Sequence, residues 1–188
     1  MKNIAIFASG GGSNAQKIIE HFKTKETAQV SLIISNKSNA GVLEKAAAFD
    51  IPTMLINREK FYKTEDILKE LDAYSIDLVV LAGFLWLVPT YLVKAYKNRI
   101  LNIHPALLPD FGGKGMYGMN VHRAVKAAGE KVSGMTIHFV NEHYDEGGII
   151  FQATCHISPT DAPEDIAKNV LALEHRYFPE IIEKVIQQ

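Results

Sequence analysis

The chain of 188 residues has almost no cysteine, no excess of basic charge and no long hydrophobic run. Its single cysteine, Cys155, cannot form a disulfide within the chain, which is typical of a reducing compartment. The formal net charge of −1 lacks the basic character that a nucleic-acid partner requires. Apolar runs such as Leu78–Leu81 are far shorter than a membrane span of about 20 residues, and the N-terminus lacks a signal-peptide pattern. We therefore expect a cytoplasmic protein without a nucleic-acid or membrane partner.

The residues that are present are those of an ordinary globular core. Hydrophobic residues make up 47% of the chain, and no repeat, low-complexity tract or linker interrupts it. This length suits one domain, residues 1–188. The sequence does not indicate whether the protein is a monomer or a homodimer.

Short apolar runs that alternate with amphipathic segments predict an α/β fold. Uninterrupted apolar runs are typical of strands buried on both faces of a parallel sheet. We expect strands at 4–8, 30–34, 52–56, 77–82, 100–103, 132–140 and 149–156. We expect helices after residue 14, at 41–49, around 67–71, at 122–128 and from 161 onward, the last one kinked or briefly broken at Pro179. The predicted architecture is a doubly wound, mostly parallel, Rossmann-like sheet with helices on both faces and one late antiparallel strand.

A glycine-rich segment, Ser9–Asn14, joins the first predicted strand to the first helix. Backbone N–H groups in such a loop and the positive end of the helix dipole favour an anion. The segment formally fits a dinucleotide fingerprint, but the second strand ends in Ser35-Asn36-Lys37, without an acidic residue for a ribose. The Walker pattern is absent. A monophosphate suits the loop best, and a tight turn without a ligand is the alternative.

The segment Arg99–Asp110 carries the strongest chemical signal. Its predicted strand delivers Asn102 and His104 to a carboxyl end, where ligands bind in open α/β sheets. An Asn amide can donate to an oxygen that gains negative charge, and a His can move protons near neutral pH. These residue types favour acyl-type transfer through a tetrahedral intermediate. The alternative is that Asn102 caps a turn and His104 is a satisfied loop histidine.

Three further features bear on this site. The apolar run Phe84–Val88 either fills the core or lines a pocket for a flat apolar ligand. The glycine-dense segment 111–118 is a candidate lid. The histidines His138, His143 and His156 lack cysteine partners and the H-E-x-x-H spacing, so we expect no metal site.

Five segments together resemble one known family. They are Ser9-Gly-Gly-Gly-Ser-Asn14, Leu81-Ala-Gly-Phe84, Asn102-Ile-His-Pro-Ala-Leu-Leu-Pro109, His138-Phe-Val140 and Tyr144-Asp-Glu-Gly-Gly-Ile-Ile150. Over essentially its full length the chain is similar to the folate-dependent formyltransferases that act on glycinamide ribonucleotide. The resemblance implies transfer of the formyl group of 10-formyltetrahydrofolate to the amine of 5-phosphoribosyl glycinamide, in de novo purine biosynthesis, with small-molecule substrates and no metal.

The resemblance also implies roles for individual residues. Asn102, His104 and Asp145 fall on the catalytic positions, where Asn102 and a protonated His104 would stabilise the oxyanion and Asp145 would tune His104. The family's ribonucleotide-binding positions correspond to Gly11, Gly12, Ser13, Asn14 and Glu174. Its folate-binding positions correspond to Lys60, Leu85, Trp86, Leu87, Val88, Asn102, Asn141, Glu142, His143 and Tyr144.

The chain departs from the family pattern near the folate. Trp86 stands where familiar bacterial members have an arginine, and Lys60 falls near a second arginine position. Methionyl-tRNA formyltransferases and formyltetrahydrofolate hydrolases share the catalytic pattern but carry an additional domain. Because the pattern here begins at residue 4 and the last predicted helix ends the chain, we expect neither activity. A nucleotide-binding module without catalysis is the alternative from another class.

Overall fold

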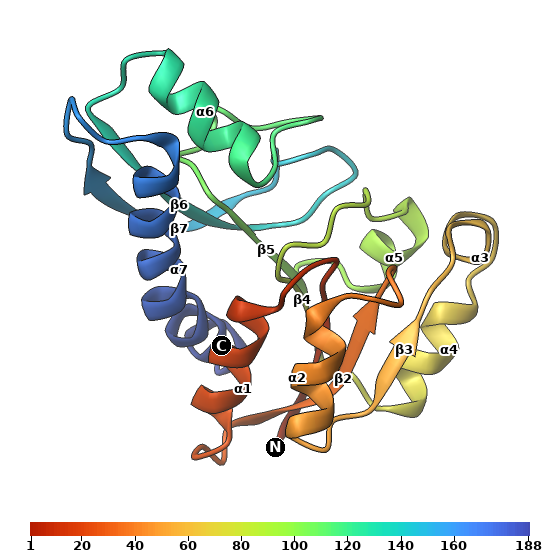
Figure 1. Ribbon diagram of the computed structural model, residues 1–188. Helices are drawn as coiled ribbons and strands as arrows, with labels where there is room; N and C mark the ends of the chain where they lie inside the picture. The colour runs from red at the N-terminus through yellow and green to blue at the C-terminus, as the bar shows by residue number, and fades with distance from the viewer.

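The computed structural model describes residues 1–188 and contains one continuous seven-stranded sheet (Figure 1). The strands are β1 (Lys2–Phe7), β2 (Ala28–Ser35), β3 (Thr53–Leu55), β4 (Leu78–Leu81), β5 (Ile100–His104), β6 (Val132–Phe139) and β7 (Ile149–His156). The helices are α1 (Ser13–Phe22), α2 (Gly41–Ala48), α3 (Arg58–Lys63), α4 (Asp66–Ala73), α5 (Thr90–Ala95), α6 (Met119–Ala127) and α7 (Pro163–Ile186).

The strand order is β3-β2-β1-β4-β5-β6-β7. The first five strands in this order pair in parallel, whereas β6 pairs antiparallel with both β5 and β7. The predicted doubly wound, mostly parallel sheet with a late antiparallel strand is therefore confirmed. The chain reverses its direction of winding between β1 and β4, which is where open α/β sheets bind ligands.

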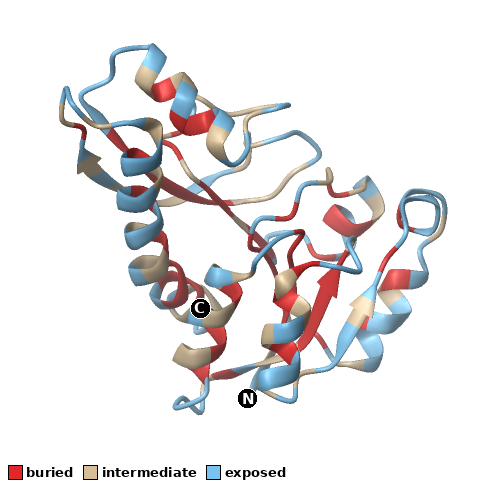
Figure 2. Ribbon diagram, viewed as in Figure 1, coloured by how far each residue is buried: buried red, intermediate tan, exposed pale blue.

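Helices cover both faces of the sheet because alternate strand residues point to opposite sides. In β1, Ile4 and Ile6 pack with α1, α2, α6 and α7, whereas Ala5 and Phe7 pack with α3, α4 and α5. The central strands are buried and the outer helix faces are exposed (Figure 2). This burial on both faces explains the uninterrupted apolar runs in the sequence.

The elements differ from the prediction in three places. The last helix continues through Pro179 without a break, because its neighbours Phe178, Ile181 and Ile182 are buried against the sheet. Helix α6 begins at Met119, so His122 lies inside the helix and does not open it. The six-residue helices α3 and α5 were not predicted. No helix combines the length and the apolar composition that crossing a bilayer requires.

Candidate functional site

A cavity of about 690 Å³ lies at the carboxyl ends of the parallel strands. Its walls come from the segment after β4, from β5, from the segment 113–119, from the loop before β7, and from α6 and α7. Fourteen of its 28 lining residues are hydrophobic. A largely apolar cavity with a few converging polar groups is typical of a small-molecule site.

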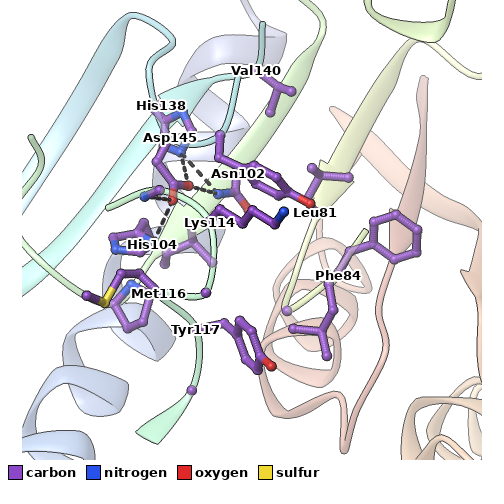
Figure 3. A pocket seen from close by; sticks show the side chains of 18 of the residues that line it. Leu81, Phe84, Asn102, His104, Lys114, Met116, Tyr117, His138, Val140 and Asp145 are labelled. Carbon is purple, nitrogen blue, oxygen red and sulfur yellow. Dashed lines mark hydrogen bonds and ion pairs between the residues drawn. The ribbon is translucent and has the colours of Figure 1, made fainter. Parts of the chain in front are cut away.

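The three predicted catalytic residues meet in this cavity (Figure 3). Asn102 and His104 project from β5, and Asp145 comes from the loop between β6 and β7. The Asn102 Nδ2 atom donates to Asp145 Oδ1 at 3.4 Å, and His104 Nδ1 lies 3.5 Å from Asp145 Oδ2. Residues 43 positions apart in the sequence thus form one cluster.

His138 is a fourth member of this cluster, which the sequence analysis did not identify. It is the register partner of Asn102 on the neighbouring strand β6. Its Nε2 atom lies 3.0 Å from Asn102 Nδ2 and 3.6 Å from Asp145 Oδ1. Pairing strands 100–103 and 132–140 in antiparallel register would have revealed the contact, but the sequence does not fix that register.

Hydrogen bonds to the backbone indicate the tautomers of both histidines. The Nδ1 atom of His138 lies 2.8 Å from the Phe139 carbonyl and so carries the proton, which leaves Nε2 to accept from Asn102. The Nε2 atom of His104 lies 2.8 Å from the Phe111 carbonyl and must donate to it. The Nδ1 atom of His104 therefore faces Asp145.

Burial and charge act in opposite directions at this centre. Burial alone would raise the pKa of Asp145, but His138, the charge of His104 and the Gly113 N–H hold it below its ordinary value. For His104, burial lowers the pKa and outweighs Asp145, which raises it. Asp145 thus acts on His104 in the expected direction, but burial has the larger effect, and the pKa of the His104 side chain, which is 3% exposed, is lowered.

A second polar pair, Asn14 and Glu174, lies in another part of the cavity wall. Asn14 Nδ2 donates to Glu174 Oε2 at 2.6 Å, which joins the start of α1 to the middle of α7. Burial raises the pKa of Glu174 to about 7, although the hydrogen bond from Asn14 opposes this shift. Asn14 Oδ1 and His122 Nδ1 are buried without a partner, so both can bind polar groups of a ligand.

The remaining predicted ribonucleotide residues, Gly11, Gly12 and Ser13, do not line the cavity, but they lead directly into Asn14. Gly12 has a left-handed backbone, φ = 72°, and a Cβ atom there would lie 2.7 Å from the Val42 side chain. Close packing thus fixes the glycine loop against α2. No group of three or more His, Cys, Asp or Glu side chains is arranged so that it could hold a metal ion.

The predicted folate residues divide into two groups. The segment Leu85–Val88 and the residues His143 and Tyr144 line the cavity, so the run after β4 both packs into the core and walls a pocket. Trp86 belongs to an aromatic cluster with Phe61, Tyr62 and Phe84. The other predicted residues, Lys60, Asn141 and Glu142, do not line the cavity.

The sequence of residues 2–182 matches the family described as Formyl transferase. The chain belongs to the formyl transferase family. A chloroplastic phosphoribosylglycinamide formyltransferase of Arabidopsis thaliana is 42% identical over 193 residues, which cover 100% of this formyl transferase and 66% of the relative. The Vigna unguiculata relative of the same name is 41% identical, and the chain covers 62% of it. The chain thus spans slightly less than two thirds of these plant relatives.

The chain covers most of the length of its bacterial relatives. The phosphoribosylglycinamide formyltransferase of Bacillus subtilis is 35% identical, with 99% of this chain and 95% of the relative covered. The crystal structure of the Bacillus halodurans protein of that name superposes with a TM-score of 0.89 at 37% identity, covering 100% of this chain and 96% of that one. The Anaplasma phagocytophilum structure superposes with a TM-score of 0.91 at 34% identity, covering 100% and 87%.

Proposed function

We propose that this formyl transferase moves the formyl group of 10-formyltetrahydrofolate to the amine of 5-phosphoribosyl glycinamide. The observation that carries the proposal is the cluster of Asn102, His104 and Asp145 inside a largely apolar cavity. The named bacterial relative, which the chain matches over nearly its full length, supports this choice of substrates. We treat residues 1–188 as one formyltransferase domain.

The reaction forms one C–N bond and breaks another. The amine nitrogen attacks the formyl carbon, and the carbonyl electron pair moves to oxygen, which becomes an oxyanion. Collapse of this intermediate breaks the bond to N10 of the folate, and the proton lost by the amine ends on N10. The products are the formylated amine and tetrahydrofolate, so no oxidant, reductant or covalent enzyme intermediate is required.

The catalytic cluster can assist both proton transfer and the stabilisation of developing charge. A neutral His104 next to the carboxylate of Asp145 is able to accept a proton from the attacking amine and to pass it on. The Asp145 carboxylate then stabilises the imidazolium. For Asn102 or His104 to donate to the oxyanion, each must exchange a present acceptor, His138 Nε2 or the Phe111 carbonyl, for the substrate oxygen.

The two substrates fit different parts of the cavity. The apolar segment Leu85–Val88, together with His143 and Tyr144, supports binding of the flat folate ring system. The half-buried Asn14 and the buried Glu174, a pair that adjoins the glycine loop, support binding of the ribonucleotide. The proposed folate contacts do not include Lys60, Asn141 and Glu142, since these side chains lie outside the cavity wall.

The cellular setting is a separate part of the proposal. Both substrates are small molecules, and the formal net charge of −1 gives no reason for a nucleic-acid partner. We place the protein in the cytoplasm as a monomer or homodimer without a membrane partner, although the plant relative is named as chloroplastic.

The test is a steady-state assay of tetrahydrofolate formation from 10-formyltetrahydrofolate, with and without 5-phosphoribosyl glycinamide. We expect turnover that depends on the amine, and Asn102→Ala should lower kcat by about 10²-fold without unfolding the protein. Turnover without the amine, accompanied by free formate, would instead identify a hydrolase. Ligand binding without any turnover would identify a binding module.

A further inference from the structure

Lys114 is the only lysine or arginine that lines the cavity. It lies in the segment between β5 and α6, and it takes part in no ion pair or hydrogen bond. Figure 3 shows its side chain among the residues of this cavity, which also include Asn102 and Leu81. An uncommitted cation thus lines the cavity in which the proposed reaction develops negative charge.

The backbone holds Lys114 next to the catalytic carboxylate. The N–H of the preceding residue, Gly113, donates to Asp145 Oδ2 at 3.0 Å. Gly113 and Gly115 flank Lys114 with φ values of 95° and 91°, which side-chain-bearing residues rarely adopt. Between these two glycines, Lys114 is exposed to solvent and also lines the cavity.

The other donors at the centre are already engaged. Both hydrogens of Asn102 Nδ2 are used, one by His138 Nε2 and one by Asp145 Oδ1. The Nε2–H of His104 is used by the Phe111 carbonyl, and its Nδ1 faces Asp145. Asn102 and His104 can therefore donate to an oxyanion only by giving up a present acceptor, whereas the three N–H groups of Lys114 are free.

We propose that the Lys114 ammonium donates a hydrogen bond to the formyl oxygen and stabilises the oxyanion of the tetrahedral intermediate. This role rests on the proposed formyl transfer. The Lys114 proton is shared with the oxygen and not transferred, and the carbonyl electron pair returns when the bond to N10 breaks. The Asn102 amide oxygen, which accepts no hydrogen bond within the protein, is then free to accept from the attacking amine.

A charge that acts only on the intermediate changes kcat more than it changes substrate binding. We therefore expect Lys114→Met to lower kcat by roughly 10²–10³-fold, the usual effect of one lost oxyanion donor. The KM values for both substrates should stay within about three-fold of wild type. Lys114→Arg, which keeps the charge, should recover at least about ten-fold of the lost kcat. Lys97→Met, a change of an exposed lysine outside the cavity, is the matched control and should behave as wild type.

Binding is measured separately from turnover through Trp86, the only tryptophan in the chain, which lines the cavity. Quenching of its fluorescence by tetrahydrofolate should give similar Kd values for wild type and Lys114→Met, and thermal unfolding should confirm that both are folded. A wild-type kcat in Lys114→Met would overturn the proposal. A KM for the ribonucleotide raised ten-fold or more at unchanged kcat would also overturn it, since Lys114 would then bind the phosphate. Failure of the proposed function itself would appear in wild type, as absence of amine-dependent turnover.

Discussion

The free-energy cost of burying the single residue Glu174 depends on pH. It is 6% exposed and its one polar partner is Asn14, which donates to it at 2.6 Å. Burial disfavours the charged carboxylate and raises the pKa from 4.5 to about 7. Between these values the folded protein holds a proton that the unfolded chain has released. Stability therefore falls as the pH rises through this window, and the full shift corresponds to at most about 3 kcal/mol.

Glu174→Gln removes this titration while it keeps the shape of the protonated side chain. We expect the variant to gain stability relative to wild type between pH 5 and pH 8, because only wild type must bury a charge at the higher pH. Urea unfolding at both pH values measures the difference. The matched control is Glu180→Gln, an exposed glutamate on the same helix. If the free energy of unfolding of Glu174→Gln differed from that of wild type by the same amount at both pH values, the raised pKa of Glu174 would be contradicted.

At the scale of elements, the segment between β5 and α6 is tied to the rest of the site by two polar contacts. The Phe111 carbonyl accepts from His104 Nε2 at 2.8 Å, and the Gly113 N–H donates to Asp145 Oδ2 at 3.0 Å. Further along the segment, Tyr117 is 52% exposed, whereas Phe111 and Met116 pack against the core. The predicted lid is thus anchored at the end that adjoins the catalytic cluster.

Removing the carboxylate should release this anchor. In Asp145→Ala the amide of Gly113 loses its acceptor, and a lost hydrogen bond of about 1–2 kcal/mol predicts roughly 5–30-fold faster hydrogen exchange there. Amides of the central strands β1 and β4 should exchange as in wild type. Asp145→Asn is the control, because its side chain retains an oxygen that can accept from Gly113. Unchanged exchange at Gly113 in Asp145→Ala would show that other contacts hold the segment.

Sequence patterns predicted the elements whose signal is local. The strands of the parallel sheet appear as uninterrupted apolar runs because both of their faces are buried. The helices α3 and α5 have only six residues each, too few to show a helical period. Pro179 indicated a break, but the burial of Phe178 and Ile182 outweighs the lost backbone hydrogen bond.

At the scale of the whole molecule, parallel strand topology explains why the site could be anticipated. Asn102 and His104 were predicted at the site because their strand ends at the carboxyl edge of the parallel sheet, whereas Asn14 and Asp145 were implied by the family resemblance. Two features were not predicted. The contact of His138 with Asn102 depends on strand register, and the position of Lys114 in the cavity lining depends on the conformation of a loop.

The same topology brings residues of both proposed binding regions and of the proposed reaction centre into one cavity. Leu85–Val88 follows β4, the pair Asn14 and Glu174 belongs to α1 and α7, and the cluster around His104 lies at the end of β5. The fate of the formyl carbon therefore tests the account most directly. With 10-formyltetrahydrofolate labelled with ¹³C in the formyl group, NMR should show the label in the formamide of the ribonucleotide product, at a rate proportional to enzyme. Label that accumulates as free formate, or stays on the folate, would contradict formyl transfer by this protein.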